Sequence, residues 1–476
     1  MKSYTFNRIQ KNIIKSFSPK KSGIKHLSSS NSDVELINET SSAIPDSFKS
    51  NFLQSLLERG FIHQCTDYKE LDNVMQYDGS NQLQSPVAAY LGFDATAKSL
   101  HVGSLLQIMI LRNLQKSGHK PIILIGGGTT KVGDPSGKDE SRQLLTEEVI
   151  QENIVSLTKV FEKFIKFGTG PTDAILVNNA DWLDSIKYLD FLRNYGRYFT
   201  INRMLAFESV KQRLSREQPL TFLEFNYLLL QAYDFLELNR RYNVKLQLGG
   251  SDQWGNIISG VELTRKVDQQ QVFGLTAPLL TTSDGKKMGK TASGAVWLNK
   301  DLLSEFEYWQ FWRNTADADV IRFLKIFTEL PLEKIKEFES LEGSALNDLK
   351  VMLADSATSM LHGPECLDQI HTTVKSLYSK GGGGGGDLDS LERVSLTSSD
   401  VPEEKGILVV DLLVRSQLTS SKGEAKRLIK LGGAKVNDVK VDDESKVVTR
   451  NDFDGQGRLK LSSGKKKHVL IELTNQ

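Results

Sequence analysis

Two short segments carry side chains suited to binding phosphate. The first is residues 92–104 (GFDATAKSLHVGS), a polar turn with glycine that leads into a predicted helix over residues 101–115. A helix N-terminus carries partial positive charge and unpaired N–H groups, so His101 and Ser104 at this start can donate hydrogen bonds to an anion. On helix physics alone, a cap or a surface histidine is the more common explanation.

The second segment is residues 284–291 (DGKKMGKT), which is short and dense in lysine. Lysines on such a loop can neutralise the charge that develops on a triphosphate during reaction. The pattern GxxxxGK[ST] does not fit here, so we do not expect a P-loop. Taken alone, a solvated surface loop is the simpler interpretation.

These segments need a scaffold, and the apolar pattern predicts one. Buried strands are expected at residues 87–93, 121–125, 174–177 and 245–248, with the 101–115 helix between the first two. A strand–helix–strand unit starts a parallel sheet, and ligands of such sheets bind beyond the carboxyl ends of the strands. The polar segments lie at those ends: residues 90–94, 126–134, 178–181 and 249–253.

The fold class expected is therefore α/β, with a Rossmann-like parallel-sheet catalytic domain. We assign residues 46–295 to this domain and its connective insertion, and residues 296–380 to an α-helical domain. Residues 381–405 begin with an unbroken glycine run and continue acidic, as a flexible linker does. Residues 406–476, rich in Lys and Arg, form a separate small α+β domain.

Composition excludes several classes. The 476 residues carry a net charge of +1, and no apolar run reaches the length of a membrane span, so we expect no membrane association. The two cysteines, Cys65 and Cys366, are too few for a four-cysteine zinc site or a disulfide scaffold. We predict no metal site in the protein itself.

The first residues read differently from the rest. They are basic and serine-rich, and no acidic residue occurs before Asp33. Phe6, Ile9, Ile13 and Phe17 recur at helical spacing. Such a start is typical of a mitochondrial transit peptide, so residues 1–45 are expected to direct the protein to the mitochondrial matrix. A basic tail without an address is the alternative.

Six motifs together carry a family resemblance. HVGS (101–104) and KMGKT (287–291) resemble the two signature motifs of class I aminoacyl-tRNA synthetases. Four more segments, in order, narrow the resemblance to bacterial-type tyrosyl-tRNA synthetases: YLGFDATAKSL (90–100), GDPSGK (133–138), YLLLQAYD (227–234) and QLGGSDQWGN (247–256). The match spans about residues 48–380 and the C-terminal domain. It implies a tyrosine–tRNA ligase that uses ATP with Mg²⁺ as a substrate complex and has no tightly bound cofactor.

The resemblance also implies residue roles. The tyrosine site would comprise Tyr90 and Asp234 at the phenol, Asp134, Tyr227 and Gln231 at the ammonium group, and Gln253 near the carboxylate. The adenosine of ATP would lie against Gly92, Asp94, Gly250 and Asp252. Catalysis at the ATP phosphates would fall to His101, Gly103, Ser104, Lys287, Lys290 and Thr291. Lys138 and Arg142 would contact phosphate or the tRNA end.

Two details refine this expectation. The spacing of Tyr227, Gln231 and Asp234 puts them on one helix face, and the surrounding apolar residues Phe222, Leu223, Leu228–Leu230 and Phe235 predict that this face is buried. The first signature commonly ends in His or Asn, so Ser104 is a departure, for which we expect altered ATP geometry and retained activity.

Residues 406–474 resemble the S4 RNA-binding domain that ends bacterial-type tyrosyl-tRNA synthetases. Its basic residues would contact RNA phosphates: Arg415, Lys422, Lys426, Arg427 and Lys430, with Lys435 and Lys465–Lys467 nearby. The resemblance implies tRNA(Tyr) as partner, with the helical domain near the anticodon stem, and a homodimer. A solvated pair of charged helices is the bland alternative.

Three rival functions remain to be weighed. A tryptophanyl-tRNA synthetase would share the fold, but Tyr90 and Asp234 suit a phenol. An RNA-binding protein with a dead active site is disfavoured because the motif lysines and carboxylates are intact, whereas a second RNA role in mitochondria stays open. A dehydrogenase is disfavoured because no GxGxxG follows the first strand.

Overall fold

The computed structural model describes residues 43–76, 85–135, 145–291, 294–378, 391–397, 400–402, 405–464 and 467–474. The expected leader therefore lies almost wholly outside the described residues, as do Lys138, Arg142, Lys465, Lys466 and the glycine run 381–386. The side chains of Lys290 and Thr291 are likewise outside what is described.

The central sheet has the strand order β1-β6-β5-β2-β3-β4, in which only β1, at the edge, runs antiparallel to its neighbour. The strands are β1 Gln64–Cys65, β2 Ala88–Phe93, β3 Lys120–Ile125, β4 Ile175–Asn178, β5 Val244–Gly250 and β6 Phe273–Ala277. The order reverses between β2 and β5, which makes the crevice beyond their carboxyl ends the expected ligand site.

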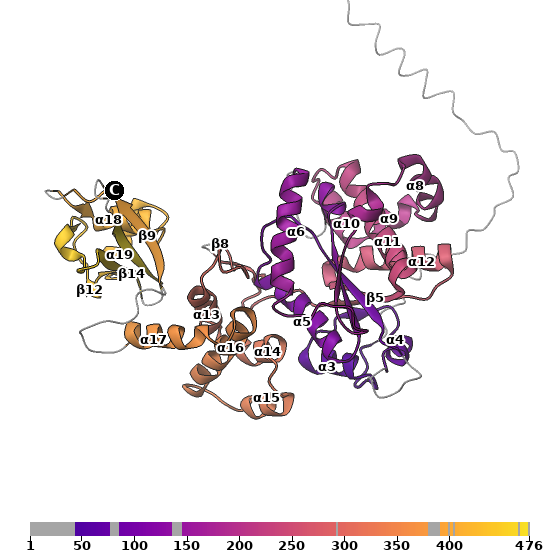
Figure 1. Ribbon diagram of the computed structural model, residues 1–476, viewed down its shortest axis with the longest axis horizontal. Coiled ribbons are helices and arrows are strands. Elements are labelled where there is room, and N and C mark those ends of the chain that lie inside the picture. Colours follow the sequence, from indigo (N-terminus) through magenta and orange to yellow (C-terminus); the bar gives the residue numbers. More distant parts are fainter. Residues whose placement is uncertain are drawn as a thin grey trace, which may run out of the picture. The chain divides into compact units, whose positions relative to one another are not determined.

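Helices cover both faces of this sheet, with α5 and α6 on one side and α11 and α12 on the other (Figure 1). Alternate residues of one strand enter different cores: Leu91 faces the α5 side and Tyr90 the α11 side. The helices are α3 Asn51–Arg59, α4 Tyr68–Val74, α5 Val102–Lys116, α6 Glu147–Phe161, α7 Ala180–Leu183, α8 Tyr188–Asn194, α9 Ile201–Ala206, α10 Glu208–Ser215, α11 Phe222–Tyr242 and α12 Trp254–Asp268. Short 3-10 turns lie at η1 Thr129–Lys131, η2 Gly196–Tyr198 and η3 Ser251–Gln253.

Helix α11 begins and ends where its sequence dictates. Thr221 and Glu224 form a capping box, in which each side chain accepts a hydrogen bond from the other's backbone N–H. The helix ends at Asn243, whose left-handed backbone (φ 51°) is tolerated by asparagine better than by most residues. These ends fix the face that carries Tyr227 and Asp234.

An all-helical segment follows two short strands, β7 Lys290–Thr291 and β8 Gly294–Ala295. Its helices are α13 Glu305–Arg313, α14 Asp317–Phe327, α15 Leu332–Phe338, α16 Ala345–His362 and α17 Cys366–Tyr378. In its core, Tyr308 and Phe323 pack edge to face with Trp312, as do Phe323 and Phe327 with each other, and the rings of Trp312 and Phe327 are tilted.

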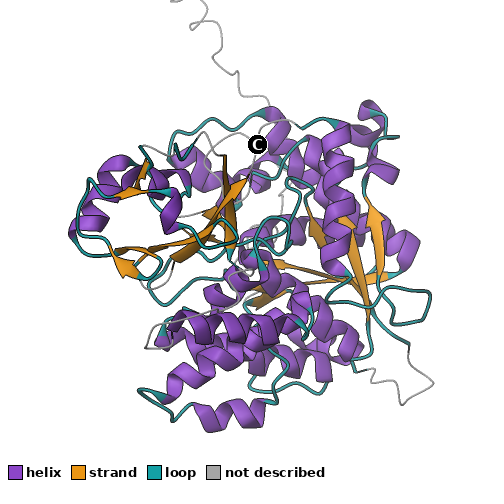
Figure 2. Cartoon of the chain, turned by 60° about the vertical axis from the view of Figure 1, so that its left-hand side comes forward, coloured by secondary structure: helices purple, strands orange, loops and turns teal. Residues whose placement is uncertain are grey.

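The C-terminal domain has a sheet and core of its own, and its strands are drawn in orange in Figure 2. The sheet order is β12-β11-β14-β15-β9, beside a small β10-β13 pair. Its elements are β9 Glu392–Thr397, β10 Ile407–Leu408, α18 Val409–Arg415, α19 Lys422–Lys430, β11 Ala434–Val436, β12 Val439–Lys440, β13 Val447–Val448, η5 Arg450–Asp452, β14 Arg458–Ser463 and β15 Lys467–Thr474.

The expected linker 381–405 is wrong in its second half. Strand β9 lies within that range and pairs in parallel with β15 over six residue pairs. The strand belongs to the C-terminal sheet because it hydrogen-bonds to the backbone N–H and C=O groups on the side of β15 that β14 does not pair with. The domain thus begins near residue 391, before the predicted start at 406.

The α/β fold class and the strand positions are confirmed. The predicted strands 87–93, 121–125, 174–177 and 245–248 correspond to β2, β3, β4 and β5, and the helix predicted at 101–115 is α5. Within the described residues, no helix is long and apolar enough to cross a bilayer.

Candidate active site

A cavity of about 480 Å³ opens beyond the carboxyl ends of β2 and β5. It lies at the reversal of strand order and gathers residues from sequence positions far apart. The predicted residues that line it are Tyr90, Gly92, Asp94, His101, Gly103, Ser104, Asp134, Tyr227, Gln231, Asp234, Gly250, Asp252, Gln253 and Lys287. One cavity thus joins the candidate amino-acid and phosphate elements.

Asp234 lies on the cavity wall and is only 2% exposed. Its carboxylate accepts hydrogen bonds from the Trp182 Nε1 at 2.7 Å and the Asn179 Nδ2 at 2.9 Å. Burial raises the pKa of Asp234 to about 7, although these two donors act to lower it. Each carboxylate oxygen accepts one of these two bonds, so the group has lone pairs left to accept a further hydrogen bond from a buried donor.

Burial raises the pKa of the Tyr90 hydroxyl well above its usual value. The negative charge of the neighbouring Asp234 raises it further. This hydroxyl is buried and has no hydrogen-bond partner among the described residues. Because an unpaired buried polar group is costly, the pair of Tyr90 and Asp234 suits a ligand hydroxyl placed between them.

A chain of amides and carboxylates continues along the wall. Gln253 Nε2 donates to Asp134 Oδ2 at 2.7 Å, and Asn256 Nδ2 donates to Gln253 Oε1 at 3.2 Å and to Gln231 Oε1 at 2.9 Å. Nearby, burial and the charge of Asp134 raise the pKa of Asp252. Carboxylates dominate this part of the cavity, so it favours a cationic group on the ligand.

The turn after β2 is held from two sides. The Ala95 N–H donates to Thr130 Oγ1 at 3.0 Å, and the Ala95 carbonyl accepts from Asn153 Nδ2 at 2.8 Å. These bonds fix Asp94, whose carboxylate accepts from the Tyr227 hydroxyl at 3.4 Å. Gly92 is exposed within an otherwise buried strand, so it gives a ligand access to the sheet backbone.

The two signature motifs touch through their glycines. A side chain at Gly103 would come within 2.8 Å of the Met288 carbonyl oxygen, and one at Gly289 within 3.0 Å of the Gly103 nitrogen. Gly289 also has φ of 108°, which side-chain-bearing residues rarely adopt. The lysine-bearing loop therefore lies directly on the N-terminus of α5, where His101 is the N-cap and Ser104 is in the first turn.

The two adjacent lysines of the loop differ. Lys286 forms an exposed ion pair with Asp284 at 2.6 Å, whereas Lys287 lines the cavity. The sequence pattern alone could not separate them. For Lys290 and Thr291, the structure describes only the backbone, in β7.

The Tyr227–Gln231–Asp234 face is confirmed as part of a buried cavity wall, but its predicted surroundings are partly wrong. Leu228, Leu229 and Phe235 are buried. Phe222 and Leu223, in the first turn of α11, are instead 69% and 46% exposed.

Sequence analysis missed Asn179 and Trp182 as partners of Asp234. Both lie just after β4, within or next to the polar segment 178–181 that follows that strand. Their position beyond a parallel strand was a usable signal, but no motif pointed to them.

The basic residues of the C-terminal domain are exposed, yet several are paired within the domain. Lys422 pairs with Asp411 at 2.7 Å, and Lys430 pairs with Glu444 at 3.1 Å. Such exposed pairs contribute little free energy, so an RNA phosphate can replace the acidic partner at small cost. Across the described residues, no group of three or more His, Cys, Asp or Glu side chains could hold a metal ion.

Comparisons with known proteins agree with this geometry. A family model described as tRNA synthetases class I (W and Y) matches residues 81–379, and one described as the tyrosine–tRNA ligase SYY-like C-terminal domain matches residues 392–471. Tyrosine–tRNA ligases of Caulobacter vibrioides and Dinoroseobacter shibae are 56% and 53% identical, covering 90% and 89% of this chain and 98% of each relative.

Solved structures show the same relationship. A C-terminally truncated mitochondrial tyrosyl-tRNA synthetase of Aspergillus nidulans is 30% identical with a TM-score of 0.61, covering 72% of this chain and 98% of that one. The corresponding truncated protein of Coccidioides posadasii is also 30% identical, with a TM-score of 0.57, covering 68% of this chain and 91% of that one.

Proposed function

The chain belongs to the class I tyrosyl-tRNA synthetases of the bacterial type, and from this membership we propose how its residues divide the work of a mitochondrial tyrosine–tRNA ligase. Its activity is to activate tyrosine with ATP and to load the tyrosyl group onto tRNA. The tryptophan-specific alternative is not favoured, because the relatives at 53–56% identity are tyrosine–tRNA ligases.

The observation that carries the assignment of the amino-acid site is the buried pair of Tyr90 and Asp234. The substrate phenol would donate its hydrogen bond to the Asp234 carboxylate and accept one from the Tyr90 hydroxyl, which has no other partner in the described residues. The substrate ammonium would then lie near Asp134, Tyr227 and Gln231, on the acidic part of the same wall.

The substrate carboxylate would point toward the signature motifs and attack the α-phosphorus of ATP. A new carboxylate–phosphorus bond forms, and pyrophosphate leaves with the electrons of the broken phosphorus–oxygen bond. No protein base is required because the carboxylate is already ionised. The protein contributes position and charge: His101, Ser104 and Lys287 at the phosphates, and Gly92, Asp94, Gly250 and Asp252 at the nucleoside. Mg²⁺ enters with ATP, held by phosphates and water.

The direct test is amino-acid-dependent ATP–pyrophosphate exchange by the protein without residues 1–45. We expect exchange with tyrosine and none above background with tryptophan or phenylalanine. A folded protein that exchanges with none of the three would contradict the proposed ligase site and favour a non-catalytic RNA-binding role.

The C-terminal domain would bind tRNA through the exposed cations of α18 and α19. Deleting residues 391–476 is expected to lower kcat/KM for tRNA charging by roughly 100-fold, because several phosphate contacts are lost together, while tyrosine-dependent exchange stays near the full-length rate. Truncation should be tolerated, since the truncated neighbours crystallised as folded proteins. Equal losses in both assays would contradict a domain dedicated to RNA.

Helices α8 to α11 are neighbours in Figure 1 and carry several exposed apolar side chains, which a homodimer would explain. These side chains are Tyr188, Leu189, Ile201, Leu205, Leu214, Phe222 and Leu223. Phe222→Asp should raise the dimer dissociation constant by at least about 30-fold, since it puts a charge into an apolar interface. Sedimentation measures this, with Val155→Asp, an exposed residue on α6, as control. A monomeric unmodified protein would refute the dimer.

Mitochondrial location rests on the basic, acid-poor start of the chain and on the mitochondrial origin of the truncated neighbours. Residues 1–45 fused to a fluorescent protein should carry it into mitochondria. Fluorescence that stays in the cytosol would contradict the proposed leader.

A further inference from the structure

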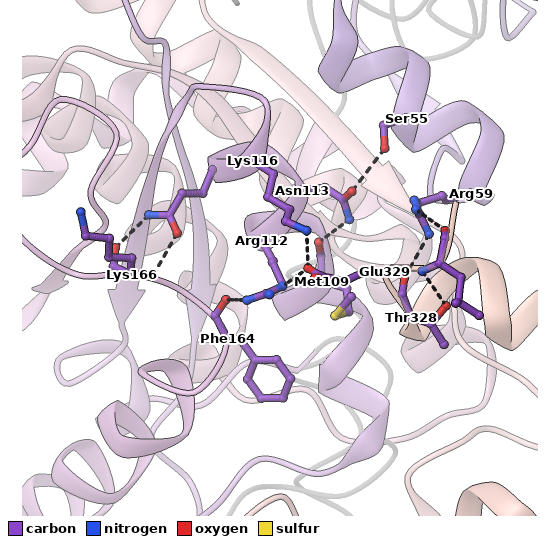
Figure 3. Close-up of polar contacts among 12 residues, drawn as sticks. Ser55, Arg59, Met109, Arg112, Asn113, Lys116, Phe164, Lys166, Thr328 and Glu329 are labelled. Atoms are coloured by element: carbon purple, nitrogen blue, oxygen red, sulfur yellow. Dashed lines mark hydrogen bonds and ion pairs between the residues drawn. The ribbon is translucent and has the colours of Figure 1, made fainter. Parts of the chain in front are cut away.

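Helix α14 of the all-helical segment and the residues after it contact two elements that lead to the phosphate site. Near its N-terminus it holds residues 281–283, which lead directly into the lysine-bearing loop. Beyond its C-terminus, Glu329 contacts α5, the helix that begins with HVGS (Figure 3). The segment from α14 to Glu329 is therefore bonded to the residues that precede the lysine-bearing loop and to the C-terminal half of the helix whose first turn carries HVGS.

At the first end the contact is made by a buried carboxylate. Asp319 is 2% exposed, and its Oδ2 accepts hydrogen bonds from the Ser283 N–H at 2.9 Å and the Ser283 hydroxyl at 3.0 Å. Arg322 pairs with Asp319 Oδ1 at 2.9 Å and also donates to the Thr281 carbonyl. Charge-assisted hydrogen bonds of this kind are stronger than neutral ones, so they hold Thr281 and Ser283 firmly against α14.

Backbone hydrogen bonds connect the residues that α14 holds to Lys287. Residues 281 and 287 form an antiparallel bridge, and the Thr282 N–H donates to the Lys286 carbonyl at 2.9 Å. The Gly285 N–H closes the turn on the Thr282 carbonyl at 2.9 Å. Because this hairpin is a single hydrogen-bonded unit, the place of Ser283 determines where Lys287 meets the cavity.

At the second end, Glu329 pairs with Arg112 and with Lys116 at 2.6 Å, both on α5. Burial acts to raise the pKa of Glu329, but these two cations outweigh it and bring the pKa to about 2. Arg59 of α3 donates to the carbonyls of Lys325 at 2.8 Å and Thr328 at 3.1 Å. The C-terminal end of α14 is thereby fixed to the helices of the catalytic domain.

We propose that Asp319 is a positioning residue for adenylate formation, through which α14 holds the Lys287 hairpin against the N-terminus of α5. Asp319 touches no substrate and acts through Ser283 and the hairpin. The inference rests on the role at the phosphates proposed above for Lys287. It means that the helical segment, besides any contact with tRNA, orders the ATP site.

The test is tyrosine-dependent ATP–pyrophosphate exchange by full-length variants. Asp319→Asn keeps the size of the side chain and loses its charge, and we expect about a tenfold loss in kcat/KM for ATP. Ser283→Ala, on the exposed loop, removes one donor without affecting the core, and a loss of about threefold is expected. The tyrosine dissociation constant, measured without ATP, should not change, because Tyr90 and Asp234 stand on β2 and α11.

A double-mutant cycle separates positioning from general destabilisation. In a Lys287→Ala background, Asp319→Asn should cost less than about twofold, because the lysine it positions is gone. The control is Glu339→Gln, which breaks the ion pair with Lys325 on the same helix and should leave exchange unchanged. If the losses from Asp319→Asn and Lys287→Ala are additive, or if Asp319→Asn leaves the ATP kinetics unchanged, this inference is overturned and the proposed function is not affected. Failure of the unmodified protein to exchange would instead overturn the proposed function, and the inference with it.

Discussion

Replacing Lys287 with alanine is expected to lower kcat for tyrosine-dependent exchange by about 10²–10³-fold, the usual effect of removing one group that stabilises developing charge. Lys287 lines the cavity next to the HVGS helix start, with no ion pair that would hold it elsewhere among the described residues. Negative charge on the leaving pyrophosphate grows toward the transition state, so a nearby ammonium group stabilises that state more than bound ATP. Stopped-flow measurement of adenylate formation checks this directly.

The neighbouring Lys286 provides a matched control. It has the same side chain, lies one residue away, and is paired with Asp284 on the exposed side of the hairpin. Lys286→Ala should change kcat by less than about threefold, as expected for an exposed pair. If both variants lose activity equally, the loop acts through its overall charge and not through a lysine placed at the phosphates.

The sheet and the position of its site were predictable because both follow from local patterns. A short apolar run followed by a polar segment predicts a buried parallel strand and its functional end, and β2 and β5 both have this pattern. Helical spacing alone predicted that Tyr227 and Asp234 lie on the same face of one helix.

The rest depends on which distant segments meet, and spacing carries no information on that. Trp182 and Asn179 reach Asp234 from the end of β4, more than 50 residues away. Phe222 and Leu223 were predicted to be buried because the sequence of a helix start does not show whether another element of the chain covers an apolar residue there. Strand β9 was not predicted because its pairing partner β15 lies about 70 residues later in the chain, and local sequence carries no sign of that pairing.

Asp234→Ala is expected to reduce the preference for tyrosine over phenylalanine, as the ratio of kcat/KM values, by about 10- to 100-fold. A hydrogen bond from a neutral donor to a buried carboxylate contributes about 1.5–3 kcal/mol, and phenylalanine cannot form it. Without the carboxylate, neither substrate leaves an acceptor unpaired, so the distinction shrinks. Pyrophosphate exchange with each amino acid measures the ratio, and unchanged selectivity would refute the phenol role. Glu237→Gln, another buried carboxylate on α11 that pairs with Arg240 and Arg241, is the control.

The same carboxylate should give tyrosine binding a pH dependence. Burial raises the pKa of Asp234 to about 7, with smaller contributions of the same sign from Asp94 and Glu237 and opposing hydrogen bonds from Asn179 and Trp182. The ionised carboxylate accepts a hydrogen bond from the phenol more strongly than the protonated acid does, so tyrosine binds best when Asp234 has lost its proton. Tyrosine affinity should therefore fall as pH drops below about 7, by at most about tenfold per pH unit, and level off above it. In Asp234→Asn, which cannot ionise, this dependence should vanish while affinity stays low throughout. Calorimetric titration of tyrosine without ATP, from about pH 5.5 to about 8.5, compares the two profiles. If they are parallel, the titrating group is another one, and Asp234 does not accept the substrate phenol.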